Sequence, residues 1–391
     1  MVKLAILADD LTGAADAAGA FAHVGWPTRL VFEAGQGGDA LVLVRSTESR
    51  DLPAADAAEV NRRAASGLPP GAIVYKKIDS MLRGHPREEL RGVMTALGDT
   101  RCVVAAALPG EGRTTVGGRQ RFAGSPPASI DLAAMFGRGQ GLPVTRLDLG
   151  EVRRGPEHIA RVIAGLEVGP LVVDAETAAD LVSIAGGVVA SGIRLVAGSA
   201  GLARQLALAL PGERSASVVA GWKAIGAILV VAASRHAAMA AQVEALGAAG
   251  VTVVRPTAAM LDGDETDLDW LVDELARQLA VDRPVVLTTS GHDPSRHGPA
   301  FVVRLLAGAV VRLAERELVG GLVLTGGDVA AGVVAALGAR EIVLGGEVRP
   351  AIPWGVLHSA LLPPVPVVTK AGSFGERDAL VECLRWIGGR K

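Results

Sequence analysis

Two adjacent carboxylates and a hydroxyl group follow the first apolar run of the sequence. Asp9, Asp10 and Thr12 come directly after the run 4–8, and an alanine-rich segment follows them. Paired acids at the end of a strand can hold sugar hydroxyls, orient a nucleophile or share a metal ion. Either acid alone could instead cap the next helix, because a carboxylate accepts hydrogen bonds from free N–H groups at a helix N-terminus. We favour a chemical role for the pair over a capping role for both.

Cations and a third aspartate follow two other apolar runs. Arg50 comes after the run that ends at residue 44, and the run 73–75 continues into KKIDS at 76–80, with Arg83 beyond it. Lysines at a strand end could neutralise a substrate carboxylate, and Asp79 could accept a hydrogen bond or a proton from a hydroxyl. Each of these residues could instead be ordinary solvated surface charge.

A glycine-containing segment carries one more cation. The sequence GEGRTT at 110–115 follows the apolar run 103–107 and places Arg113 between glycine and threonine residues. This pattern is typical of an anion-binding loop and equally of a plain glycine turn. Both interpretations stay open.

Three loops in the second half of the chain have the composition of nucleotide-binding loops. TGGD at 325–328 precedes an apolar helix at 329–337, KAGSFG at 370–375 follows another strand, and Ser234 ends a third. Glycines at a helix N-terminus let backbone N–H groups approach a phosphate closely. Asp328 would repel phosphate, so it caps the helix, contacts a ribose hydroxyl or acts through Mg²⁺. Together the three loops predict a nucleotide pocket.

Short apolar runs alternate with longer alanine- and leucine-rich segments along the whole chain. Strands are expected at 4–8, 40–44, 73–75, 103–107, 171–173 and 195–197, with helices at 14–24, 54–65, 87–97, 158–166 and 178–190. The pattern lapses at 211–223 and resumes with strands at 225–232, 251–254, 285–288, 321–324, 341–343 and 365–368. This alternation predicts an α/β fold of two domains, each a mostly parallel sheet flanked by helices, at 1–217 and 218–391. Ligands gather at the carboxyl ends of such strands, where the polar residues above lie.

Composition narrows the class of protein. The chain has 391 residues, with 39 Lys and Arg against 41 Asp and Glu. This nearly neutral balance creates no strong positive potential to hold the phosphates of nucleic acid. Two separate cysteines predict a reducing compartment without disulfides. The longest uncharged stretch, 350–369, contains five prolines, which argues against a membrane span. The N-terminus lacks the long apolar region of a signal peptide, so we expect a soluble cytoplasmic protein.

Several standard signatures are absent from the sequence. It contains no GxxxxGK[ST], GxGxxG or HExxH motif and no protein-kinase motif set. AGSAG at 197–201 differs from the serine-hydrolase motif GxSxG at its first position. The nucleotide pocket is therefore not expected to be of the P-loop or dinucleotide-binding type.

The ordered set ADDLTGAAD, STESR, KKIDSMLRG, GRTTVGG, TGGD and TKAGSFG resembles the four-carbon acid sugar kinase family over nearly the whole chain. The resemblance implies ATP-dependent phosphorylation of threonate, erythronate or a 3-oxo-tetronate. It also implies an N-terminal sugar-acid domain, a C-terminal nucleotide domain and Mg²⁺ with the ATP. Carried over by motif, it places the acid near Asp9, Asp10, Arg50, Lys77, Ile78, Asp79, Ser80, Arg83 and Arg113. It places ATP near Ser234, Gly326, Gly327, Asp328, Val329 and Gly372.

The resemblance is imperfect at four positions. Relatives commonly have Thr, Asn, Gly and a hydroxyl residue where this chain has Met81, His85, Ala233 and Val329. Losing the hydroxyl at Val329 removes one phosphate contact. These departures motivate a second hypothesis, a non-catalytic sensor that binds a sugar acid and a nucleotide without turnover.

The sequence does not choose between two aspartates as the catalytic base. Asp79 or Asp10 is expected to orient or deprotonate the attacking hydroxyl. A hydroxy-acid dehydrogenase or lyase is a third hypothesis for the function, and the missing GxGxxG motif counts against its nicotinamide form. Alanine-rich helices such as 302–314 could pair two copies into a homodimer, although packing within one chain explains them equally well.

Overall fold

The computed structural model describes residues 2–32, 37–123, 129–137, 142–212, 214–215, 219–234, 236–263, 268–291 and 295–389. The chain divides into two compact units. The first unit contains Met1–Thr28 and Gly38–Ser215, and the second contains Arg29–Gly37 and Ala216–Lys391. The second unit is therefore built from two separate stretches of the chain. The boundary expected between residues 217 and 218 lies outside the described residues.

The first unit has a parallel sheet whose strands follow the order β3-β1-β4-β11-β5-β10-β9. These strands are β1 (Leu4–Ala8), β3 (Val42–Ser46), β4 (Ile73–Lys77), β5 (Arg101–Ala105), β9 (Thr145–Leu147), β10 (Gly169–Val173) and β11 (Leu195–Gly198). Every residue of β1 is buried, because helices cover both faces of the sheet. The uniform apolarity of its sequence, LAILA, reflects this double burial.

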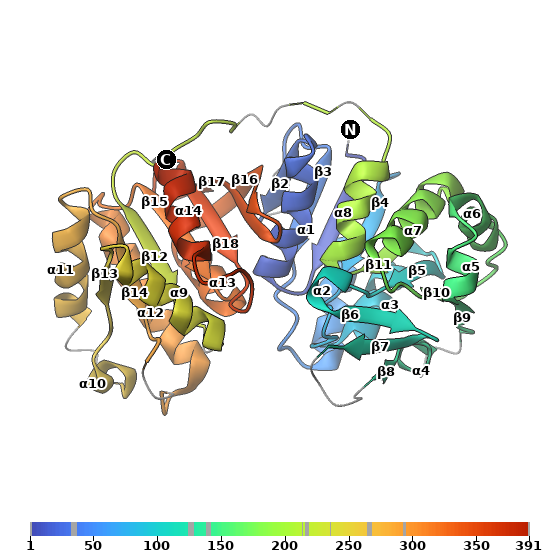
Figure 1. The fold of residues 1–391 in the computed structure, drawn as a ribbon, viewed down its shortest axis with the longest axis horizontal. Coiled ribbons are helices and arrows are strands. Elements are labelled where there is room, and N and C mark those ends of the chain that lie inside the picture. Colours follow the sequence, from blue (N-terminus) through green and yellow to red (C-terminus); the bar gives the residue numbers. More distant parts are fainter. Residues whose placement is uncertain are drawn as a thin grey trace. The chain divides into compact units, whose positions relative to one another are not determined.

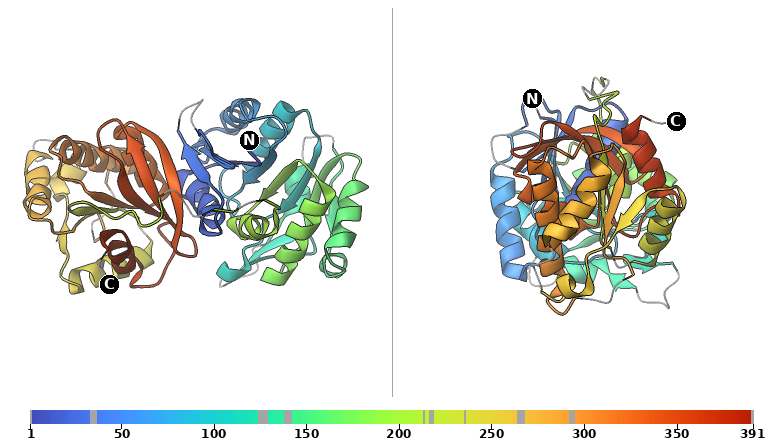
Figure 2. Two further views of the ribbon diagram at one scale, coloured as in Figure 1. Left: turned by 90° about the horizontal axis from the view of Figure 1, so that it is seen from above. Right: turned by 90° about the vertical axis from the view of Figure 1, so that its left-hand side faces the viewer.

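Helices of the first unit form a layer on each face of its sheet. In Figures 1 and 2, α2 and α3 pack together on one face, and α1, α7 and α8 cover the other. The helices are α1 (Leu11–His23), α2 (Ala54–Ser66), α3 (Pro86–Leu97), α4 (Leu132–Gly137), α5 (Leu149–Val152), α6 (Pro156–Ala164), α7 (Ala178–Ser191) and α8 (Ala200–Ala209). The small antiparallel sheet β6 (Arg113–Val116), β7 (Arg119–Phe122) and β8 (Ile130–Asp131) completes the unit.

The strand order of the first unit reverses at β1. Strand β1 lies between β3 and β4, so the chain leaves β1 toward one side of the sheet and later returns to the other. Proteins of the α/β class bind ligands at such a reversal, beside the carboxyl ends of the neighbouring strands. The loops that follow β1, β3 and β4 meet at this point.

The second unit has a mixed sheet. Strands β13 (Thr252–Val254), β14 (Val285–Thr288), β12 (Ile228–Ala232), β15 (Gly321–Thr325) and β18 (Val365–Lys370) are parallel and adjacent in that order. Antiparallel pairing continues through β17 (Ile352–Ser359) and β16 (Ala339–Arg349) to β2 (Thr28–Val31). The chain again reverses direction across the sheet at β12, which lies between β14 and β15.

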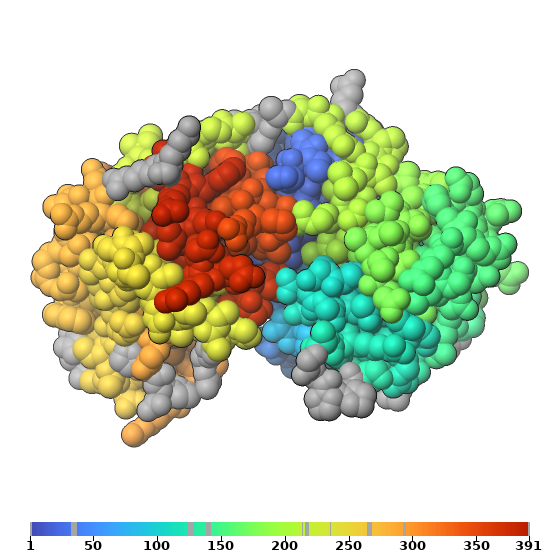
Figure 3. Space-filling model, in the orientation of Figure 1, coloured from blue at the N-terminus to red at the C-terminus, as the bar shows by residue number. Residues whose placement is uncertain are grey.

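Helices also cover both faces of the second sheet (Figure 2). They are α9 (Ala237–Ala248), α10 (Ala258–Leu261), α11 (Leu268–Leu279), α12 (Gly298–Glu315), α13 (Gly327–Ala336) and α14 (Ala379–Gly388). Helices α9 and α14 pack together over one core, in which Met239, Val243, Leu380 and Cys383 meet strand residues. The outer face of α14 lies on the surface of this unit (Figure 3, red). Each helix of the described ranges is too short or too polar to span a lipid bilayer.

The expected fold class, α/β with mostly parallel sheets flanked by helices, is confirmed. Each parallel strand expected in the two sheets is present, with ends that shift by up to a few residues. The sequence analysis did not predict β2, β9, β17 or the antiparallel strands β6 to β8. These strands are short, polar or rich in glycine and proline, so their sequences lack the continuous apolar character on which the strand prediction depended.

Candidate active site

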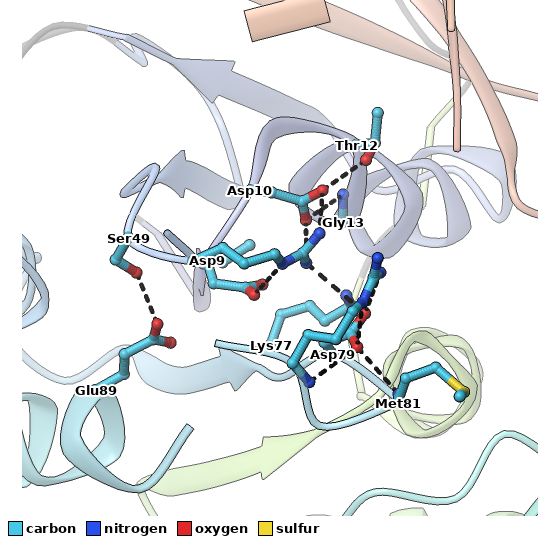
Figure 4. Close-up of polar contacts among 12 residues, drawn as sticks. Asp9, Asp10, Thr12, Gly13, Ser49, Lys77, Asp79, Met81 and Glu89 are labelled. Carbon is cyan, nitrogen blue, oxygen red and sulfur yellow. Dashed lines mark hydrogen bonds and ion pairs between the residues drawn. The ribbon is translucent and has the colours of Figure 1, made fainter. Parts of the chain in front are cut away.

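The polar residues that follow β1, β3 and β4 form one buried cluster in the first unit (Figure 4). Asp9 and Asp10 leave β1, Arg50 lies in the loop after β3, and Lys77 and Asp79 lie at the end of β4. The burial of all three aspartates is nearly complete. We call Asp9, Asp10, Arg50, Lys77 and Asp79 the acid-binding cluster, after the ligand that the sequence leads us to expect there.

Arg50 joins the two adjacent aspartates of the cluster. Its Nε donates to Asp9 Oδ2 at 2.7 Å, and its Nη atoms donate to Asp10 Oδ2 and Oδ1 at 2.8 and 2.7 Å. Burial lowers the pKa of Arg50, but the neighbouring charges of Asp10, Asp9 and Asp79 outweigh it, so the pKa is raised. The guanidinium is therefore permanently charged and fixed by the two carboxylates.

Asp10 also begins the first helix. It is the N-cap of α1, with Oδ1 accepting from the N–H of Gly13 at 3.0 Å and Oδ2 accepting from the Thr12 hydroxyl at 2.7 Å. Gly13 must be glycine here, because a Cβ would collide with the Asp10 carboxylate and lie 2.7 Å from Lys77 Nζ. The capping role and the cluster role, which the sequence analysis treated as alternatives, thus coexist in Asp10.

Asp79 lies in the loop after β4 and is held by Arg83. Arg83 donates from Nε to Asp79 Oδ2 at 3.0 Å and from Nη2 to Oδ1 at 2.9 Å, and the N–H groups of Met81 and Arg83 also reach Oδ2. Burial raises the pKa of Asp79, but the Arg83 hydrogen bonds and the charges of Lys77 and Arg50 hold it well below its usual range. The side chain of Arg83 is 63% exposed, so this ion pair lies at the rim of the cluster.

Two groups of the cluster have bonding capacity left for a ligand. The Oδ1 atom of Asp9 is buried and accepts no hydrogen bond from the described residues, and the Lys77 ammonium acts on Asp9 and Asp79 through its charge. Burial raises the pKa of Asp9, but the charges of Lys77, Arg50 and Lys76 outweigh it, so the pKa is lowered. An open carboxylate oxygen and an open ammonium in one buried cluster are what a ligand with both hydroxyl and carboxylate groups requires.

The two lysines of the KKIDS motif have different surroundings. Lys76 is fully buried and forms an ion pair with Glu89 of α3 at 2.8 Å, whereas Lys77 faces the aspartates. Successive residues of a strand point to opposite faces of the sheet, which explains the difference. Of the two lysines, Lys77 is therefore the one whose charge acts directly on the cluster.

The remaining expected acid-binding residues lie beside the cluster. Ser80 accepts a hydrogen bond from Arg113, which places this arginine from β6 next to the Asp79 loop. Ile78 has its side chain in the hydrophobic core, and its N–H donates to the Gly198 carbonyl at 2.9 Å. The side chain and the N–H group of Ile78 therefore already have partners within the protein.

The three expected nucleotide loops meet in the second unit. Gly372 packs against Ser234 so closely that a Cβ on Gly372 would collide with Ser234 Oγ. The N–H of Gly326 donates to the Lys370 carbonyl at 3.0 Å. The loops after β12, β15 and β18 are thus in direct contact.

Gly326 and Gly327 begin helix α13. Gly326 is its N-cap with φ +88°, a conformation that favours glycine, and no heavy atom lies within 4 Å of the position of a Cβ. Asp328 lies in the first turn, and the Val329 side chain is buried. A ten-residue helix whose glycine N-terminus is open in this way suits a phosphate group.

Two buried side chains shape the loop after β18. Lys370 Nζ donates to the carbonyls of Ala371 and Phe374 at 2.9 and 2.8 Å. Gln242 of α9 donates from Nε2 to the carbonyls of Phe374, Gly375 and Glu376 at 3.1, 2.9 and 3.1 Å. Burial lowers the pKa of Lys370 to about 8. These donors turn successive loop carbonyls toward the protein.

The sequence analysis did not single out Glu89, Gln242 or Asp174. Asp174 accepts from the N–H groups of Gly117 and Gly118 at 2.6 and 2.8 Å, and so fixes the turn between β6 and β7. Its position directly after the apolar run of β10 was the same signal that marked Asp9. Glu89 and Gln242 lie inside helices, where no comparable signal distinguishes them from solvated surface residues.

The departures from the family pattern occupy different environments. Met81 is 37% exposed beside the acid-binding cluster, and its N–H donates to Asp79. His85 is the N-cap of α3 and makes no side-chain capping bond.

Among the described residues, no three His, Cys, Asp or Glu side chains lie close enough together to hold a metal ion.

Comparisons with known proteins match two domain models to the chain. A model of a sugar-binding N-terminal domain matches residues 4–206, and a model of a nucleotide-binding C-terminal domain matches residues 229–380. The chain is 35% identical to a D-threonate kinase of Bordetella bronchiseptica, over 99% of this chain and 98% of that protein. It is 32% identical to a D-threonate kinase of Salmonella typhimurium, with the same coverage.

A solved structure also has this fold. A Salmonella typhimurium LT2 protein, described there as a proposed tRNA synthase, superposes with a TM-score of 0.84 at 22% identity. The match covers 99% of this chain and 100% of that one. At this identity the likeness bears on the fold alone.

Proposed function

Because the chain belongs to the four-carbon acid sugar kinase family, we propose that it transfers a phosphoryl group from ATP to a hydroxyl of a four-carbon sugar acid. The proposal names D-threonate as the first substrate to test, since the relatives at 35% and 32% identity are called D-threonate kinases. Erythronate and 3-oxo-tetronate are the neighbouring candidates within the family.

The open groups of the acid-binding cluster carry the proposal. The Lys77 ammonium suits the carboxylate of the acid, and Asp9 Oδ1 suits one of its hydroxyls. Together with the flanking Arg83 and Arg113, the cluster holds four cations against three carboxylates. One surplus positive charge favours a ligand with a single negative charge over a neutral sugar.

Three aspartates are candidates for orienting or deprotonating the attacking hydroxyl. The oxygens of Asp10 and Asp79 already accept hydrogen bonds from the protein, whereas Asp9 Oδ1 does not. Asp79 could exchange its ion pair with Arg83 for a contact with a ligand, because the Arg83 side chain is largely exposed. The open oxygen supports adding Asp9 to the two aspartates expected from the sequence, and we favour Asp9 for this role.

The proposed nucleotide site is the meeting point of the loops after β12, β15 and β18. The open N-terminus of α13 would hold phosphate oxygens, with Ser234 and Gly372 beside it. Mg²⁺ usually reaches a kinase bound to the nucleotide phosphates and takes one or two protein carboxylates, and Asp328 is the acid of this loop. The metal would neutralise charge on the transferring phosphoryl group.

The decisive experiment is an ADP-release assay with MgATP and a panel of three-, four- and five-carbon aldonic and oxo-aldonic acids. The proposal expects turnover that depends on ATP and on a four-carbon acid. Two outcomes would contradict the proposal. One is ADP release at the same rate with and without the acid, and the other is no ADP release although ATP and the acid are both shown to bind. The second outcome would instead support the non-catalytic sensor, which the departures at Val329 and Ala233 motivate.

A further inference from the structure

A buried ion pair lies directly behind the acid-binding cluster. Lys76 of β4 and Glu89 of α3 are 0% and 1% exposed, and Lys76 Nζ lies 2.8 Å from Glu89 Oε2. Removing two charges from water is costly, and a buried ion pair is often no more stabilising than apolar residues of the same size. Stability alone therefore does not account for this pair.

The second oxygen of Glu89 reaches the loop that carries Arg50. The Ser49 hydroxyl donates to Glu89 Oε1 at 2.9 Å (Figure 4). It also accepts from Asn61 Nδ2 at 3.0 Å. Ser49 is 0% exposed and directly precedes Arg50. Lys76, Glu89, Ser49 and Asn61 thus form a continuous buried network from β4 to this loop.

The backbone of the loop needs such support. Glu48 has φ +45°, in the left-handed region that non-glycine residues rarely adopt. The N–H groups of Ser49 and Arg50 both donate to the Asp9 carbonyl, at 2.9 and 3.3 Å. A strained residue persists only where its surroundings fix it, and here Glu89 fixes the neighbouring Ser49 side chain.

We propose that Glu89 is a positioning residue for Arg50 and acts through the Ser49 hydroxyl, with Lys76 orienting the Glu89 carboxylate. The inference rests on the proposed function, because the guanidinium that it positions belongs to the acid-binding cluster. Because Glu89 is buried behind the cluster, we expect it to contact neither ligand. Loss of its oxygen acceptor should therefore change binding of the acid and leave binding of ATP unchanged.

Two double variants separate positioning from charge burial. Lys76→Met with Glu89→Gln removes both charges but keeps an oxygen that can accept from Ser49. Lys76→Met with Glu89→Met removes both charges and the acceptor. The two proteins are matched in net charge, and both avoid the unpaired buried charge that a single substitution would leave. Ser49→Ala removes the same hydrogen bond without touching the ion pair, and it carries the test if a double variant does not fold.

Steady-state kinetics give the first readout. We expect the Gln variant to keep a KM for D-threonate within about twofold of wild type, and the Met variant and Ser49→Ala to raise it about fivefold or more. The KM for MgATP should not change in any of them. Equal acid KM values in the two double variants, or a parallel rise of both KM values, would overturn the proposal.

Hydrogen exchange of the ligand-free protein gives a readout that needs no activity. Peptides that cover residues 46–52 should exchange faster in the Met variant and in Ser49→Ala than in wild type, and at the wild-type rate in the Gln variant. Absence of turnover in the wild type would refute the proposed function, and the exchange rates would still decide the inference. Unchanged exchange in all variants would refute the positioning role.

Discussion

The two terminal nitrogens of Arg50 contact the two oxygens of Asp10, at 2.8 and 2.7 Å, and Asp10 at the same time caps helix α1. The contact is bidentate, a geometry that a planar guanidinium provides and an ammonium does not. It fixes the loop after β3 to the first turn of the helix that follows β1. The orientation of the acid-binding cluster thus depends on the shape of this side chain as well as on its charge.

Arg50→Lys should impair acid binding although the charge is conserved. One ammonium cannot contact Asp9 and both oxygens of Asp10, so we expect the KM for the sugar acid to rise about tenfold or more. The KM for MgATP should stay the same, and steady-state kinetics with each substrate varied in turn measure both. Arg63→Lys on the exposed side of α2 is the matched control. Wild-type kinetics in Arg50→Lys would show that the bidentate contact is dispensable.

Lys77→Met should reduce the preference for acids. The substitution removes the open ammonium and keeps most of the side-chain volume, so the KM for a four-carbon acid should rise about 10- to 100-fold. Turnover of the corresponding neutral tetritol should change little, which separates loss of charge recognition from general damage. Lys223→Met, at an exposed lysine of the second unit, serves as the control. An equal loss for acid and tetritol would contradict the assignment of the carboxylate to Lys77.

The three aspartates should differ in kinetic effect. Asp9→Asn should lower kcat about 100-fold or more, since its open oxygen is the one available to a substrate hydroxyl. Asp10→Asn should chiefly raise the acid KM and lower the melting temperature, because it disturbs Arg50 and the cap of α1. ATP binding, followed by calorimetry, should survive in each variant. If Asp79→Asn or Asp10→Asn loses more kcat than Asp9→Asn, the role belongs to that residue instead.

Gln242→Leu should weaken ATP binding selectively. The variant loses the donor to the Phe374, Gly375 and Glu376 carbonyls, so the loop that carries Gly372 is no longer held against α9. We expect the KM for MgATP to rise about five- to tenfold and the acid KM to stay unchanged. Gln278→Leu, on α11 of the same unit, is the matched control. An effect on the acid KM as large as that on the ATP KM would argue against the loop assignment.

Lys370 should make stability depend on alkaline pH. Burial lowers the pKa of this ammonium in the folded protein to about 8, from an ordinary 10.5. Between these values the unfolded chain binds the proton more tightly than the folded one, so the free energy of unfolding contributed by Lys370 rises with pH. Below pH 8 both states are protonated and the contribution is constant.

Denaturant titrations of wild type and Lys370→Met from pH 7 to 10 test this sign. The stability of wild type relative to the variant should increase above pH 8. The thiol of the neighbouring Cys383 stays protonated in the folded protein over this range, because burial raises its pKa to about 12. Its ionisation in the unfolded chain is common to both proteins and cancels in their difference. A difference between the two proteins that stays constant or shrinks above pH 8 would contradict the assigned direction.

Much of the fold follows from the sequence because its central strands are buried on both faces. The run LAILA of β1 could be located to the residue, since continuous apolarity bounded by acids leaves little choice of ends. The convergence of Asp9, Arg50 and Asp79 follows from the same pattern, because parallel strands bring their carboxyl ends to one edge. By contrast, the polar sequences RTTV and RQRF of β6 and β7 pair with each other outside the main sheets, and no apolar run marks them.

The separate roles of the residues within the site were harder to predict from the sequence. Alternation along β4 predicts that Lys76 and Lys77 point to opposite faces, but only the structure shows Glu89 beneath one of them. Gln242 contacts carbonyls more than 130 positions further along the chain, and nothing in its own helix indicates this. Side chains that act on distant backbone groups leave no local pattern, so composition and spacing do not reveal them.

The pairing of β2 with β16 has a consequence for how the protein is made. Arg29 and Glu341 form an ion pair across these strands although 312 residues separate them in the sequence. At a synthesis rate of about 5 to 20 residues per second, β2 emerges from the ribosome roughly 15 to 60 seconds before its partner. A recombinant fragment that starts at residue 216 would lack β2 and expose β16 as an unpaired edge, which favours aggregation. Co-expression of an N-terminal fragment that includes β2 would be the way to obtain the second unit in soluble form.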